Sequence, residues 1–260
     1  MAQNTSIEWT DHTFNPWWGC VKVSDGCKFC YAETLAKRYG HDNWGPGKER
    51  RLMSLNHWRE PLKWNEEAEQ KGLRARVFCA SMADVFEERA PETERQRLWK
   101  LIVDTPSLDW QLLTKRPERI AECLPLDWGE GYHNVWLGTS VEDSRVLDRV
   151  GHLRSVPAIV RFLSLEPLIG PLYHLPLEGI HWAIIGGESG HGARPIQEEW
   201  VISIQEQCRI AETAFFFKQW GGVHKKKAGR ELQGRSYDEM PVPMLSSTPI
   251  LKDGISLMSL

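Results

Sequence analysis

Short apolar runs rich in β-branched and aromatic residues recur along the chain, and polar residues follow each of them. Runs of this length, bounded by polar and turn-forming residues, predict buried β-strands. They cover Arg76–Ser81, Trp110–Thr114, Asn134–Gly138, Ile159–Ser164, Trp182–Ile185 and Ala214–Phe217, with Thr13–Trp18 as an earlier candidate.

Helical patterns fall between several of these strands. The predicted helices are Tyr31–Tyr39, ended by Gly40, then Glu92–Val103, Ser140–Leu153 and Glu198–Glu212. For the third, Ser140 and Asp143 have capping-box spacing. Strands that alternate with helices predict a parallel sheet with right-handed crossovers. Six to seven β/α units predict a partial or complete parallel β/α (TIM-like) barrel, and a doubly wound open sheet is the alternative.

The chain has no low-complexity linker, so we expect one domain over residues 1–260. Within it, 41–75 is expected to be an insertion and 221–260 a C-terminal extension. The first eleven residues lack the pattern of a signal peptide, and no apolar run has the length of a membrane span. We therefore expect a cytoplasmic protein. Its 13 tryptophans exceed what a barrel core needs, which suggests that some line a cleft while most pack in the core.

Three of the six cysteines are clustered. Cys20, Cys27 and Cys30 form a C-x6-C-x2-C pattern, in a loop after the first predicted strand. In a reducing compartment such clustering indicates a metal site, and six cysteines are too few for a disulfide scaffold of this length. Zinc would need a fourth ligand, for which His12, His41 and Cys79 are the candidates.

Three thiolates leave one iron of a [4Fe–4S] cluster open, and here the sequence resembles the radical S-adenosylmethionine (SAM) superfamily. Cys27, Phe29 and Cys30 match the second half of its C-x3-C-x-aromatic-C signature, whereas Cys20 is six residues from Cys27 instead of three. The resemblance is closer to a phage and bacterial radical-SAM-like three-cysteine family of unknown function. It rests on Asn15–Cys20, Gly26–Ala32, Leu113–Pro117, Gly138–Glu142, Leu163–Leu168, Gly186–Gly190 and Lys218–Gly222.

The resemblance implies a mechanism. The amine and carboxylate of SAM would chelate the open iron, and reductive cleavage would yield a 5′-deoxyadenosyl radical that abstracts hydrogen from a substrate. An electron donor such as a flavodoxin or ferredoxin is implied with it. The substrate does not carry over from the family. A nucleic acid or nucleotide is suggested by the basic run Lys225–Lys227 close to Trp220, although such runs are more often solvated surface.

Polar residues at the strand ends are the remaining candidates for cofactor contacts, because the carboxyl ends of parallel strands converge on one face. Ser81 and Asp84 match the place where the superfamily meets the methionine amine, and Lys115 with Arg116 suits a carboxylate or phosphate. The full candidate set is Ser81, Asp84, Lys115, Arg116, Thr139, Glu166, Gly186, Gly187 and Glu188.

Each candidate also has a structural interpretation. Glu142, like Glu166, is a candidate for ribose or substrate, but for Glu142 a cap or an ion pair with Arg116 or Arg161 is favoured. The two glycines fit a plain turn equally well. Cys79 suits a hydrogen donor or, preferably, the core, and Cys123 and Cys208 suit packing. For the whole chain, the rival hypothesis is a zinc-stabilised nucleic-acid-binding module without redox chemistry.

Overall fold

The computed structural model describes residues 5, 7–223 and 228–242. Its large sheet has seven strands in the order β1-β4-β5-β6-β7-β8-β9, and every neighbouring pair is parallel. These strands are β1 (His12–Phe14), β4 (Ala75–Cys79), β5 (Leu108–Thr114), β6 (Val135–Ser140), β7 (Val160–Leu165), β8 (Trp182–Gly186) and β9 (Ala214–Gln219). Six of the seven predicted strands are therefore confirmed, and the seventh is confirmed in its first part.

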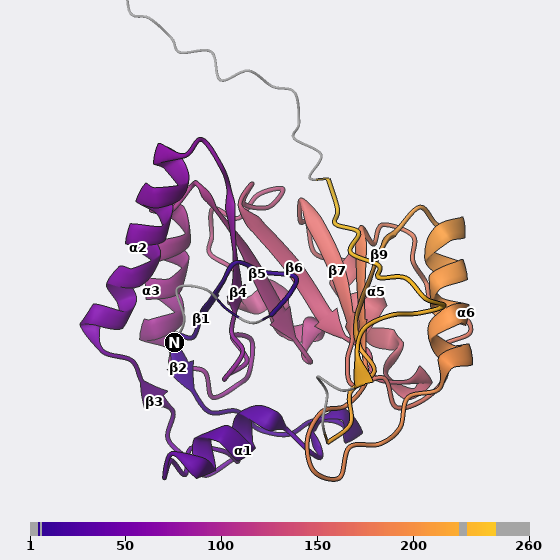
Figure 1. Ribbon diagram of the computed structural model, residues 1–260. Helices are drawn as coiled ribbons and strands as arrows, with labels where there is room; N and C mark the ends of the chain where they lie inside the picture. Colours follow the sequence, from indigo (N-terminus) through magenta and orange to yellow (C-terminus); the bar gives the residue numbers. More distant parts are fainter. Residues whose placement is uncertain (1–4, 6, 224–227, 243–260) are drawn as a thin grey trace, which may run out of the picture.

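The sheet curls into a half-barrel with helices on its outer side (Figure 1). This confirms a partial parallel β/α barrel. The helices are α1 (Tyr31–Arg38), α2 (Leu55–Gln70), α3 (Glu92–Val103), α4 (Ile120–Cys123), α5 (Asp148–Arg154) and α6 (Glu198–Ile210), with short 3-10 turns η1 (Asp25–Cys27), η2 (Pro117–Arg119) and η3 (Ser144–Val146).

Side chains alternate between the two faces of each strand. On β5, Trp110 and Leu112 belong to the larger apolar cluster, which also contains Leu98 of α3 and Val201 of α6. A second, mainly aromatic cluster fills the concave side and includes Phe78, Trp136, Trp182 and Trp9. Most of the tryptophans are thus core residues, and the inside of the half-barrel is lined with rings.

Two predicted elements differ from the structure. Thr13–Trp18 is divided: β1 ends at Phe14, and Trp17–Trp18 forms β2, which pairs antiparallel with β3 (Arg51–Leu52). Pro16 lies at the break and has no N–H for a ladder. The helix predicted from Ser140 begins only at Asp148, because Ser140 is the last residue of β6. Asp143 instead caps η3 by accepting a hydrogen bond from the Arg145 N–H.

Two regions named from the sequence contribute to the core. Residues 41–75 hold β3 and α2, and Trp58 and Trp64 of α2 are buried in the larger cluster. In the C-terminal stretch, Leu232 and Tyr237 join the same cluster. Among the described residues, no helix is both long and apolar enough to cross a membrane.

Candidate functional site

The cysteine loop lies between β2 and α1, beyond the carboxyl ends of the strands (Figure 1). Gly19 begins it with φ +120°, and its N–H donates to the carbonyl of Met82 after β4. A side chain here would place its Cβ 2.3 Å from the Asn43 carbonyl oxygen. The backbone therefore passes close to a neighbouring loop at a point that only glycine fits.

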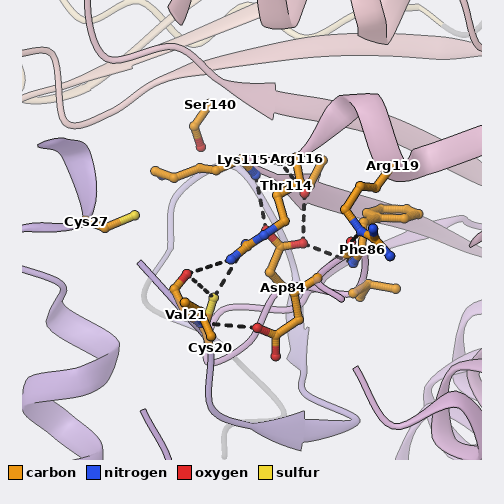
Figure 2. Close-up of polar contacts among 12 residues, drawn as sticks. Cys20, Val21, Cys27, Asp84, Phe86, Thr114, Lys115, Arg116, Arg119 and Ser140 are labelled. Atoms are coloured by element: carbon orange, nitrogen blue, oxygen red, sulfur yellow. Dashed lines mark hydrogen bonds and ion pairs between the residues drawn. The ribbon is translucent and has the colours of Figure 1, made fainter. Parts of the chain in front are cut away.

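The three cysteines line one cavity of about 900 Å³, together with residues from the strand ends. Burial raises the pKa of the Cys20 thiol, Asp84 and Glu87 add to the shift, and Arg116 opposes it. Burial also raises the pKa of the Cys30 thiol. Hydrogen bonds from the N–H groups of the first turn of α1 and the charge of Lys115 lower it, but by less. In Figure 2 the Cys27 sulfur points into the space beside Lys115.

Asp84 and Arg116 form a buried ion pair that joins two strand ends to the loop (Figure 2). One carboxylate oxygen of Asp84 accepts from the Thr114 hydroxyl at 2.8 Å, and the other accepts from Arg116 Nη1 at 2.9 Å. Arg116 Nη2 donates to the Val21 carbonyl at 2.7 Å. The two predicted cofactor contacts therefore position the cysteine loop.

A second buried ion pair holds the same loop segment. Glu87 accepts from the Val21 N–H at 3.2 Å and from the guanidinium of Arg50. Burial raises the pKa of Glu87, while Arg50 and Arg116 act against the rise. The sequence analysis missed both residues. The only available signal was that Glu87 lies three residues after Asp84 in the same strand-end loop.

Two further carboxylates anchor the rest of the loop. Glu142, only 1% exposed, accepts from the Ser24 hydroxyl at 2.7 Å and pairs with Arg149 at 2.8 Å. Glu142 is thus in a buried ion pair, but its partner is Arg149, so the expected partners Arg116 and Arg161 were wrong. Glu188 binds Arg194 through both oxygens, and Arg194 Nη2 donates to the Asp25 carbonyl at 3.0 Å.

Other candidates face the cavity directly. Lys115, Ser81 and Glu166 line it. The ammonium of Lys115 is 3.7 Å from Glu142, and Ser81 accepts from the Asn15 amide at 3.1 Å. Glu166 accepts from Lys218 Nζ at 2.8 and 2.9 Å. Asp84, Arg116 and Glu188 line the same cavity, but they also hold the cysteine loop.

Three candidates lie away from the cavity wall. Thr139 is fully buried, and its hydroxyl donates to the Thr114 carbonyl at 3.0 Å. The missing Cβ of Gly186 would meet Glu166 at 3.1 Å, and that of Gly187 would meet the Trp220 carbonyl oxygen at 2.1 Å. Both glycines therefore permit close packing between strand ends.

Three thiols that line one cavity could hold a cluster or, with a fourth ligand, a zinc ion. Among the described residues, no three or more His, Cys, Asp and Glu side chains are grouped closely enough to hold one metal ion. Zinc draws its ligands to about 2.3 Å from one centre, whereas each cysteine of a cubane binds a separate iron. Of the suggested fourth zinc ligands, Cys79 is fully buried in the sheet–helix core and His12 stacks on Trp64 at 4.4 Å. His41 lies edge-on to Trp18, a residue of the cavity wall, at 5.6 Å between the ring centroids.

A family model described as "Protein of unknown function (DUF5131)" matches residues 4–241. The chain belongs to this family. No curated protein matches the sequence.

Solved structures with a similar fold include those of spore photoproduct lyase. A cysteine-to-serine mutant has 13% identity and a TM-score of 0.49, over 80% of this chain and 64% of that one. A double mutant with bound AdoMet and dinucleoside spore photoproduct has 12% identity and a TM-score of 0.48, over 76% and 61%. The chain thus spans less than two thirds of the length of these proteins.

Proposed function

We propose that this protein is a radical-SAM-type iron–sulfur enzyme, with a [4Fe–4S] cluster on Cys20, Cys27 and Cys30. The observation that carries the proposal is that these three thiols line one cavity at the carboxyl-end face of a parallel half-barrel. Active sites of β/α barrels occupy this face. Three thiolates leave one iron for SAM, as the resemblance of the cysteine motif implies.

When bound, the reduced cluster would pass one electron to the sulfonium of SAM, whose bond to the 5′ carbon breaks into methionine and a 5′-deoxyadenosyl radical. The electron would come from a donor such as a flavodoxin or ferredoxin. The protein's part is to hold the loop and exclude water. Asp84 with Arg116, Glu87, Glu142 and Glu188 fix the loop backbone.

Lys115, Ser81 and Glu166 are the proposed contacts for SAM. Lys115 brings a positive charge to the cavity wall near Cys30, where it suits a carboxylate. The side chain of Glu166 is 21% exposed and keeps acceptor capacity for a ribose, although Lys218 and Gln219 already bind it.

The test is anaerobic reconstitution of the full chain, followed by iron and sulfide analysis and an assay for 5′-deoxyadenosine. We expect about four irons and four sulfides per chain, and SAM cleavage once a reductant is added. The matched control is Cys123→Ala, since Cys123 is buried in the core. One tightly bound zinc without iron uptake would overturn the proposal in favour of the zinc-stabilised module.

A further inference from the structure

The cavity extends well beyond the cysteine loop into the half-barrel. Its far wall includes Trp9, Phe78 and Leu113 from the concave side of the sheet. At about 900 Å³ it lies near the top of the 300–1,000 Å³ range of small-molecule sites. Space therefore remains for part of a substrate beside a cofactor.

The floor of this cavity is aromatic. We call Trp9 and Phe78 the floor; their ring centroids are 4.6 Å apart, and Trp136 and Trp182 belong to the same cluster. A flat ring would gain contact area and stacking energy on such a surface.

The floor also has unused hydrogen-bonding groups. Gln111 pairs in register with Phe78 on one side and Trp136 on the other. Gln111 is fully buried next to the floor, and within the described part of the chain neither its amide nitrogen nor its amide oxygen has a partner, and the indole N–H groups of Trp9 and Trp136 have none either. Of these three residues, Trp9 lines the cavity. Buried polar groups are nearly always satisfied. An alkyl chain would leave the Trp9 N–H unpaired, whereas a heterocycle with an acceptor at its edge would suit it.

The opposite end of the cavity is basic. We call Lys28, Arg38 and Arg51 the rim. Arg38 lines the cavity, while Lys28 and Arg51 lie over Phe29 and Trp18, which also line it, at 5.3 and 5.0 Å from the ring centroids.

The rim cations are available to a ligand. Within the described part of the chain, none of them has a carboxylate within ion-pair distance. The carboxylates that line the cavity are already paired: Asp84 with Arg116, Glu166 with Lys218, and Glu188 with Arg194. An anionic group at the mouth would therefore meet cations that no acid of this part of the protein neutralises.

We propose that the cavity takes a nucleotide unit as substrate, with its base on the floor and its phosphate on the rim. The assignment of this nucleotide as the substrate rests on the proposed radical chemistry. A ring alone explains the floor, and a phosphate alone explains the rim, but a nucleotide explains both. The unit is either a free nucleotide or one residue of a single strand whose base enters the cavity, because a base paired in a duplex cannot reach the floor.

The experiment measures fluorescence anisotropy of a labelled single-stranded oligonucleotide with the full-length protein, at several salt concentrations. Arg38→Ala and Lys28→Ala should weaken binding, and each should reduce the slope of log K against log[salt] by about 0.7. The matched control is Arg59→Ala, an exposed arginine on α2. Binding that both rim variants leave unchanged, or no binding of strand or mononucleotide, overturns the proposal.

Base contact is tested with an oligonucleotide that contains one 2-aminopurine. Its fluorescence should be quenched on binding, and Phe78→Leu should reduce the quenching and weaken binding about tenfold. Urea unfolding of this variant confirms that it is folded. An unchanged signal with the folded variant contradicts a base on the floor.

Competition separates the two sources of the nucleotide. Displacement of the strand by an equal concentration of mononucleotide indicates a free nucleotide, and displacement only by another single strand indicates a nucleic acid. If the reconstituted protein cleaves SAM but binds neither, the substrate class is wrong and the radical chemistry stands. If the protein binds the strand but takes up no iron, the nucleotide-binding site stands and the proposed radical chemistry is wrong.

Discussion

The Nη1 atom of Arg116 donates a hydrogen bond to Asp84 at 2.9 Å and lies 3.8 Å from the Cys20 sulfur. The same guanidinium thus neutralises a buried carboxylate and contacts a proposed cluster ligand. The side chains of Arg116 and Asp84 are each only 8% exposed, so solvent screens the attraction between them little.

Arg116→Ala should therefore lower the free energy of unfolding by about 3–5 kcal/mol, since it leaves the Asp84 charge buried and unpaired. The Asp84→Asn/Arg116→Met double variant removes both charges and should recover much of this loss. Urea unfolding of Asp84→Asn, of Arg116→Met and of the double variant gives the coupling energy. An Arg116→Ala protein within about 1 kcal/mol of wild type would contradict the anchoring role.

Gly26→Ala tests the contact between the loop and Glu142. Gly26 has an ordinary backbone conformation, but an added Cβ would lie 2.3 Å from the Glu142 carboxyl group. We expect a loss of about 1–3 kcal/mol from overpacking, measured by urea unfolding. Gly47→Ala is the control, since no atom lies within 4 Å of its added Cβ. Glu142→Asp, which is one methylene shorter, should partly rescue Gly26→Ala; equal effects of Gly26→Ala and Gly47→Ala would argue against the contact.

The pH dependence of stability should report on Asp143. Hydrogen bonds from Arg145 lower the pKa of Asp143 below its usual value of 3.8, and Arg145 also pairs with Asp25 of the loop at 2.7 Å. A lowered folded-state pKa stabilises the protein above pH 3.8, and this stabilisation is lost as the pH falls through the folded-state value. Below about pH 4 the wild type should therefore lose stability more steeply than Asp143→Asn. The measurement is the free energy of unfolding of both proteins at several acidic pH values. Curves of this free energy against pH that run parallel for wild type and Asp143→Asn would refute the prediction.

The six cysteines should fall into two classes. Alanine at Cys20, Cys27 or Cys30 should abolish a stable cluster, because a second iron then loses its ligand. Alanine at Cys79, Cys123 or Cys208 should retain full iron and cost only about 1–2 kcal/mol of packing. Iron analysis of the reconstituted variants, normalised to folded protein, is the measurement. A Cys20→Ala protein with full iron would contradict the motif assignment, because the spacing between Cys20 and Cys27 is the one that differs from the superfamily signature.

The strands were predictable because each is a short apolar run, and their polar ends follow from the parallel order. The error at Ser140 has a local cause: the capping-box spacing starts at the last residue of a strand, and only the ladder between β6 and β7 shows that Ser140 still belongs to that strand. The division of Thr13–Trp18 depends on β3, whose two exposed residues carry no strand pattern.

The roles of the strand-end carboxylates were less predictable than their location. Glu142 and Glu188 were candidates for ligand contacts, but their partners Arg149 and Arg194 lie seven and six residues later in loops and helices of no distinctive pattern. Arg50 is 37 residues from Glu87. A sequence shows which charges exist, whereas burial decides which of them must be paired with each other.

The anchors of the cysteine loop come from far along the chain. Val21 is held by residues 66 and 95 positions later, Ser24 by one 118 positions later, and Asp25 by one 169 positions later. During synthesis the three cysteines leave the ribosome early, whereas the last anchor of their loop, Arg194, leaves it much later. The loop is therefore without its full set of anchors until most of the chain has left the ribosome. We therefore expect that the proposed cluster is delivered after the barrel is complete and not on the ribosome.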